Sequence, residues 1–301
     1  MNKLVCLTKR NCAVFLKDKA AVFYSLLSMI IVLVLMGVFL GDMNVSAVTN
    51  ILNQYGGVRD EVMDSANAKV LISYWTLSGL MVVNALTVTL TVLGTMVTDK
   101  TGNKLKSFYT APVSKFVVAL SYIASAVIIG FLFCTLTLAG YILYIYMNGG
   151  AVLSAGALLK VMGYTLVNVT IFSIVMYLFA LIVNSSSAWS GIATIVGTLV
   201  GFFGAIYVPI GSLPEQVAAA LKCFPILHGT SLMRKVMCEQ AMADTFTNVP
   251  AQVLDVYREE MGIDILMNES LISDELQLSF MVICGMIALV VIAVTTKKKQ
   301  M

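Results

Sequence analysis

The sequence predicts an all-α membrane protein with six transmembrane helices, an N-terminal amphipathic interfacial helix and an outer pair of short re-entrant helices. Apolar residues make up 59% of the 301 residues and charged residues only 12%, whereas about a quarter of a soluble domain is charged. A helix needs about 20 apolar residues to cross a bilayer, and hydrocarbon leaves the backbone no other way to satisfy its hydrogen bonds. Six such stretches, containing no acid and one base (Lys160), lie at 20–40, 70–97, 116–147, 157–183, 188–209 and 278–294.

The charges between these stretches predict a multi-pass plasma-membrane protein with both termini in the cytoplasm. With that orientation the inner segments are 1–19, 98–115, 184–187 and 295–301, and they hold twelve bases and two acids. The rest of the chain then holds seven bases and fourteen acids. Basic residues gather in the cytoplasmic loops of membrane proteins, so the inverted orientation fits poorly. The compact layout indicates a bacterial plasma membrane.

The first segment, 1–19, has the pattern of a helix lying on the membrane. Lys9, Arg10 and Lys17 fall on one arc of a helical projection, and Phe15 falls on the opposite arc with other apolar residues. A basic amphipathic helix suits an anionic inner leaflet, so membrane lipids are expected partners. The alternative is an ordinary basic flank that only sets orientation.

The segment 20–209 holds the first five spans, and the inner loop 98–115 connects the second span to the third. We expect this loop to contain a short helix, 99–111, parallel to the membrane. Pro112 cannot continue a helix from upstream, but it suits a turn or a first helical position. Apolar anchors ringed by lysines suit docking into a groove of another protein. The alternative is a basic loop bound to lipid headgroups. The outer loop 41–69 is polar and is expected to have no defined fold.

The largest segment outside the spans, 210–276, divides into two parts. Three prolines, at Pro209, Pro214 and Pro225, break 210–238 too often for a span, so a pair of short helices dipping into the outer leaflet is expected. The part 239–276 is acidic and is expected to form a small outer region, before the last span and basic tail in 277–301. Whether Cys223 and Cys238 pair stays open.

The sequence lacks the motifs of several classes of enzyme. The chain has no Gly-Lys pair and hence no phosphate-binding loop, and its only histidine is His228, which excludes the familiar metalloprotease motif. We therefore expect no catalytic residue, no metal or cofactor bound by this chain, and no nucleic acid partner. A membrane pathway without its own energy source remains, either a passive pore or part of a powered machine.

Two spans carry patterns that suit a pathway or a contact. The second span has a polar stripe that includes Asn84, Thr87, Thr91 and Thr95. The stripe could line a pathway, or its threonines could bond their own helix carbonyls. The fifth span carries Gly197-x-x-x-Gly201, a small-residue pattern that permits close helix approach either between two copies or within one.

The inner loop reads Asp-Lys-Thr-Gly-Asn-Lys-Leu-Lys-Ser-Phe-Tyr-Thr-Ala-Pro-Val-Ser-Lys from Asp99 to Lys115. Together with the outer prolines and Arg234, it resembles the six-span half of a type-2 ABC exporter permease. The resemblance covers nearly the whole chain and implies a coupling loop that passes motion from an ATPase to the spans. The residues that would form this loop are Asp99, Lys100, Gly102, Lys104, Leu105, Lys106, Phe108, Tyr109 and Pro112.

The resemblance also implies partners and a direction of transport. Two copies, as a homodimer or a related heterodimer, would form the pathway above two separate ABC ATPase subunits, which would hold the ATP and Mg²⁺. An amphipathic or hydrophobic substrate such as a drug, lipid, peptide or glycan-lipid would leave outward. The alternatives are an unpowered channel or scaffold and, third, a membrane enzyme, for which the sequence offers no site.

Overall fold

The computed structural model describes residues 3–35, 41–57, 59–110, 112–267 and 270–298, and it confirms an all-α membrane protein. The first half of the described chain contains α1 (Lys3–Lys17), α2 (Lys19–Leu35), α3 (Gly41–Tyr55), α4 (Glu61–Thr101), α5 (Lys104–Thr110) and α6 (Lys115–Met147). The second half contains α7 (Ala155–Ile182), α8 (Ser186–Phe203), α9 (Glu215–Leu221), α10 (Pro225–Met237), α11 (Glu239–Thr245), α12 (Ala251–Glu260) and α13 (Asp274–Lys298). A 3-10 turn, η2 (Ile210–Ser212), precedes α9, and a two-residue antiparallel pair, β1 (Leu266–Met267) and β2 (Ser270–Leu271), precedes α13.

Within the described residues, five helices are long and apolar enough to cross a membrane, namely α4, α6, α7, α8 and α13. The predicted first span, 20–40, falls on α2, which has 17 described residues. Its last part, 36–40, lies outside the described residues. The count of six spans therefore stays a prediction.

Helix α4 forms the centre of the bundle and contacts α6, α7, α8 and α3. In its most apolar stretch 78% of the residues are buried, because other helices surround it. The helix extends beyond the predicted span at both ends. Asp60 caps its first turn by accepting from the Val62 backbone N–H at 2.9 Å, and Gly102 follows its last residue.

The expectation that 41–69 lacks a defined fold is wrong. This segment forms α3 and the first turns of α4. Val45, Val48 and Leu52 are buried against the rest of the protein, at the three- and four-residue spacing of an amphipathic helix. The polar residues between them hide this pattern in a segment that is too short to span.

Helix α8 is shorter than the predicted span 188–209. It ends at Phe203, where Gly204 caps it and Ala205 takes a positive φ of 49°. Short helices do form within 210–238, with Pro214 in the N-cap position of α9 and Pro225 in the first turn of α10. Whether they re-enter the membrane stays a prediction. Cys223 and Cys238 are both free thiols.

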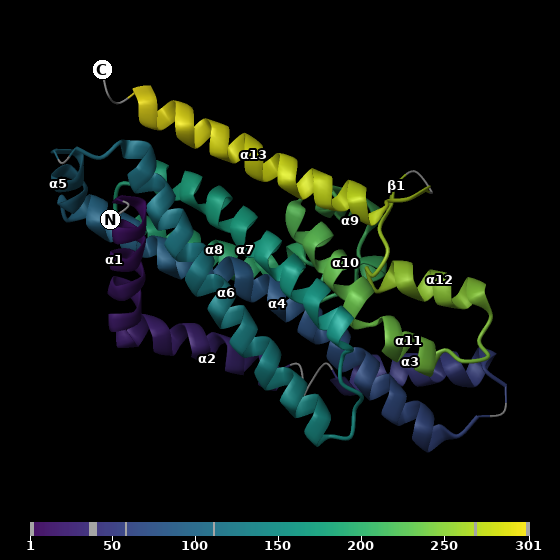
Figure 1. The fold of residues 1–301 in the computed structure, drawn as a ribbon. Helices are drawn as coiled ribbons and strands as arrows, with labels where there is room; N and C mark the ends of the chain where they lie inside the picture. Colours follow the sequence, from purple (N-terminus) through teal and green to yellow (C-terminus); the bar gives the residue numbers. More distant parts are fainter. Residues whose placement is uncertain (1–2, 36–40, 58, 111, 268–269, 299–301) are drawn as a thin grey trace.

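The shorter elements lie at the two opposite ends of the long helices (Figure 1). One end, which we call the basic end, holds α1, α5, the start of α6 and the last turns of α13. The other, the α12 end, holds α12, β1 and α3.

Candidate functional site

The predicted coupling loop lies at the basic end, where α4 ends and α6 begins. The Gly102 backbone N–H donates to the Thr98 carbonyl at 2.9 Å, and Asn103 takes a φ of 60°, which reverses the chain into α5. Ser114 accepts from the Val117 backbone N–H at 3.3 Å and so caps α6. The predicted helix 99–111 is wrong at its start, because α4 continues through Thr101 and α5 begins only at Lys104.

Asp99 is the centre of this site, although only 2% of it is exposed. Its carboxylate accepts from both terminal nitrogens of Arg10 on α1, one of them at 3.1 Å, and from the Tyr122 hydroxyl of α6 at 2.6 Å. The Lys104 ammonium of α5 lies 3.8 Å away. A buried carboxylate is stable only with such charge-assisted partners. Asp99 therefore ties α1, α5 and α6 to the end of α4.

Arg10 connects this cluster to the surface. Hydrogen bonding and charge from Asp99 together outweigh the cost of burial and raise the pKa of the Arg10 guanidinium, so Arg10 stays charged. The Phe108 ring of α5 lies 5.3 Å from the guanidinium carbon, within the range of a cation–π contact. The Lys3 ammonium donates to the carbonyl of Pro112, whose side chain is exposed. Two residues expected to face a partner thus also contact α1.

The predicted interfacial helix packs partly onto the protein. The Phe15 side chain is 1% exposed and makes an edge-to-face contact with Phe133 of α6, with ring centroids 6.1 Å apart. The Asn11 amide donates to the Ser121 hydroxyl at 3.2 Å. Phe15 is therefore an anchor to α6, whereas Lys9 and Lys17 are exposed. The position of α1 on a membrane stays a prediction.

Lys100 and Leu105 also turn inward. The Lys100 ammonium donates to the Leu181 and Val183 carbonyls at 2.8 and 2.7 Å, where it satisfies the C-terminus of α7. Leu105 is 5% exposed and belongs to the hydrophobic core. The exposed members of the predicted loop are Gly102, Lys104, Lys106 and Pro112. The side chain of Tyr109 lies outside the described residues.

Sequence reasoning missed Tyr122, Asn11 and Ser121, because each lies in a segment that reads as an ordinary apolar or basic helix. One signal was available. Asp99 is the only acid in the loop 98–115 and directly follows an apolar span. A single acid next to a membrane span needs a basic partner. The structure shows that this partner is Arg10.

The predicted pathway residues of α4 divide into two groups. Asn84 is 3% exposed and donates to the Thr137 hydroxyl of α6 at 3.0 Å, so it lies inside the bundle. Thr87, Thr91 and Thr95 each donate to a carbonyl of their own helix, at 2.9, 3.0 and 2.8 Å. Thr91 is exposed and the other two are partly exposed. A similar exposed line runs along the neighbouring α8, through Ser186, Ser190, Thr194 and Thr198.

A second buried cluster surrounds Arg234 of α10, towards the α12 end. Its guanidinium donates to the carbonyls of Met261 at 2.9 Å and Ala205 at 2.7 Å and is fully buried. Burial lowers the pKa of Arg234 to about 9. Its hydrogen-bond acceptors in the described chain are backbone carbonyls, so the cluster joins chain segments around α10. Pro209, at the end of the segment that follows Ala205, occupies the N-cap position of η2.

A comparison with known protein families agrees with the resemblance seen in the coupling loop. Residues 2–238 match the ABC-2 type transporter family. Neither curated proteins nor solved structures gave a match to this chain. The matched region includes α1, the Asp99 cluster and α10. This chain therefore belongs to the ABC-2 type transporter family and is a membrane permease of the type-2 ABC class.

Proposed function

We propose that this permease is the membrane subunit of an exporter driven by a separate ABC ATPase, with the basic end in the cytoplasm of a bacterial plasma membrane. The chain itself would catalyse no reaction, and ATP and Mg²⁺ would be bound by the ATPase. The excess of bases at 1–19 and 98–115 supports this orientation. The substrate would be amphipathic or hydrophobic, because the polar groups in the spans are chiefly hydroxyls and amides.

The observation that carries this proposal is the Asp99 cluster. Lys104 and Lys106 are exposed on α5, which gives a docking partner a basic surface. A displacement of α5 or α1 would reach the central helix α4 through Lys104, Arg10 and the Asp99 carboxylate. Such a direct connection suits a power stroke delivered from the cytoplasmic side.

A second copy would complete the pathway, as a homodimer or a related heterodimer. In α8 only 17% of the residues in the most apolar window are buried, compared with 78% in α4. A side chain at Gly197 would meet no other atom within 4 Å, so this face is open, whereas one at Gly201 would clash with Tyr207 of the same chain. Gly201 thus serves packing within one copy, and Gly197 is available for a close approach by another helix. The exposed hydroxyls of α4 and α8 would then line the space between the copies.

A matched pair of charge reversals tests the docking surface. Lys106→Glu places an acid on the exposed face of α5, and Lys160→Glu makes the same change near the start of α7 at the other end of the bundle. We expect Lys106→Glu to reduce co-purification of the ABC ATPase with the tagged chain by about tenfold, and Lys160→Glu to leave it within twofold. Equal recovery with both variants would contradict docking through α5. Transport of solute by the purified chain without ATPase or ATP would favour an unpowered channel instead.

A further inference from the structure

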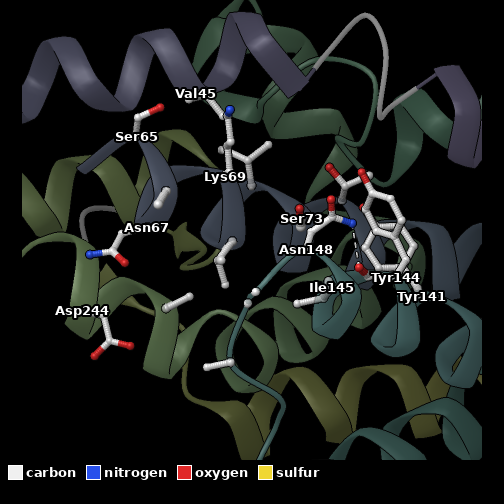
Figure 2. A pocket seen from close by; sticks show the side chains of 18 of the residues that line it. Val45, Ser65, Asn67, Lys69, Ser73, Tyr141, Tyr144, Ile145, Asn148 and Asp244 are labelled. Atoms are coloured by element: carbon white, nitrogen blue, oxygen red, sulfur yellow. Dashed lines mark hydrogen bonds between the residues drawn. The ribbon is translucent and has the colours of Figure 1, made fainter. Parts of the chain in front are cut away.

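A cavity of about 1320 Å³ lies at the end of α4 opposite to Asp99. Figure 2 shows side chains that line this cavity. The first turns of α4 and the last turns of α6 form two of its walls, and α11 contributes Asp244. Val34 of α2 and Val45 of α3 add apolar surface. The cavity exceeds the usual volume of a small-molecule site, which is roughly 300–1,000 Å³.

The lining residues are of the types that suit the level of the lipid headgroups. Lys69 directly precedes the apolar part of α4, and Tyr141 and Tyr144 lie in the last turns of α6 before the chain leaves the helix. Tyrosine and lysine at the ends of spans mark the boundary between hydrocarbon and water. A cavity lined in this way suits a ligand with a polar headgroup and an apolar tail.

The charges around the cavity are of both signs. Among the residues that the structure describes, the Lys69 ammonium has no hydrogen bond or ion pair. Glu61 and Asp244 also line the cavity, and Asp244 accepts a hydrogen bond of 2.9 Å from the Gln240 amide. Lys69 and Asp244 come from different walls (Figure 2). The two carboxylates would repel a ligand that carries only a negative charge. A ligand with separate negative and positive groups can pair with Lys69 and with the carboxylates.

Gly140 of α6 provides additional space. It lines the cavity, and a Cβ atom at this position would meet no other heavy atom within 4 Å. The space beside Gly140 is therefore open and forms part of the cavity.

We propose that this cavity binds a zwitterionic phospholipid whose headgroup carries a phosphate and a primary amine. Lys69 contacts the phosphate, and Asp244 and Glu61 accept from the ammonium. Val34 and Val45 contact the glycerol and the first methylenes. With the orientation proposed above, the lipid comes from the outer leaflet, but binding does not depend on the ATPase.

Native mass spectrometry of the detergent-purified full chain tests this site, with phosphatidylethanolamine or the anionic phosphatidylglycerol added at equal concentration. Gly140→Leu places a branched side chain in the cavity. Gly163→Leu is the matched control, because Gly163 is an exposed glycine in α7 that also has no atom within 4 Å of a Cβ. We expect Gly140→Leu to lower retention of phosphatidylethanolamine by about tenfold and Gly163→Leu to leave it within twofold. Equal loss in both variants, or none in Gly140→Leu, would overturn the proposal.

Two charge variants separate this lipid from others without altering a buried group. Lys69→Gln removes the contact with the phosphate and should weaken retention of both lipids. Asp244→Asn removes an acceptor for the amine and should weaken only phosphatidylethanolamine, by about fivefold. If the wild-type chain retains phosphatidylglycerol to the same extent as phosphatidylethanolamine, recognition of a zwitterion is wrong. The same holds if Asp244→Asn weakens retention of both lipids equally. Neither result bears on ATPase docking, which Lys106→Glu tests separately.

Discussion

Trp75 and Arg234 donate hydrogen bonds to the same backbone carbonyl, that of Met261, at 2.8 and 2.9 Å. The guanidinium carbon of Arg234 also lies 4.2 Å from the centroid of the Trp75 ring. Trp75 belongs to the central helix α4, Arg234 to α10, and Met261 follows α12. This shared acceptor fixes the chain around α12 to the middle of the bundle.

Loss of the Arg234 donors should destabilise the protein strongly. Arg234→Met keeps apolar contact with Trp75 but leaves the buried carbonyls of Ala205 and Gly262 with fewer donors. An unsatisfied buried polar group costs about 1–3 kcal/mol, so we expect a loss of roughly 3 kcal/mol in the free energy of unfolding. Thermal unfolding in detergent measures it, with the exposed Lys160→Met as control. An unfolding temperature equal to that of the control would show that the cluster contributes little.

The ion pair of Arg10 and Asp99 should show a coupling energy in a double-mutant cycle. Asp99→Asn leaves Arg10 without its charged partner, and Arg10→Gln leaves a carboxylate that is 2% exposed with only Tyr122 and Lys104. We expect the double variant to be more stable than the sum of the single losses predicts, by about 1–3 kcal/mol. Chemical unfolding of the four proteins in the same detergent provides the values. Additive losses would mean that the two side chains do not interact in solution.

The structure around Asp264, near the α12 end, should weaken in acid. Burial alone would raise the pKa of the Asp264 carboxyl, but hydrogen bonding and charge from Arg258 and Lys235 outweigh it and hold that pKa below its ordinary value. As the pH falls, the unfolded chain therefore binds a proton before the folded chain does, and the free energy of unfolding decreases. We expect this loss below about pH 4, and a flatter pH dependence in Asp264→Asn. Unfolding followed from pH 6 to pH 3 tests it, and identical slopes would contradict it.

The cap on α6 should have a measurable effect at the coupling loop. Ser114→Ala removes the acceptor for the Val117 N–H, and loss of such a cap costs about 1 kcal/mol. Ser114→Asp should restore the lost stability, because aspartate is an equally good cap. Ser107→Ala on the exposed surface of α5 is the control. Hydrogen exchange of the first amides of α6 should speed up in Ser114→Ala alone, and unchanged exchange would exclude a role for the cap.

Cross-linking should detect the proposed contact between copies along α8. We expect Thr194→Cys, in a chain whose exposed Cys6 and Cys223 are replaced by serine, to form a disulfide dimer on mild oxidation in membranes. Thr170→Cys on α7 is the control. Like Thr194, Thr170 donates to a carbonyl of its own helix, but it lies on α7 and not on α8. Dimer formation by the control alone would place the contact elsewhere.

The sequence by itself determined the helical membrane fold, which depends on local composition. Long apolar stretches without acids predicted spanning helices, because hydrocarbon excludes unpaired backbone groups and charge. The cap of α6 at Ser114 and the start of α10 at Pro225 also rest on local chemistry, a side-chain acceptor and a fixed φ. The amphipathic pattern of α3 was also present in Val45, Val48 and Leu52, but a polar background obscured it.

Only the tertiary structure decided how these charges and aromatic residues are used. Asp99 and Arg10 are 89 residues apart in the chain, and the sequence gives no measure of which base approaches which acid. Leu105 and Phe15 appeared suited to a partner or a membrane, yet both are buried. Side-chain type and spacing define a face of a helix, but the arrangement of neighbouring helices determines whether that face meets lipid, a partner or the core.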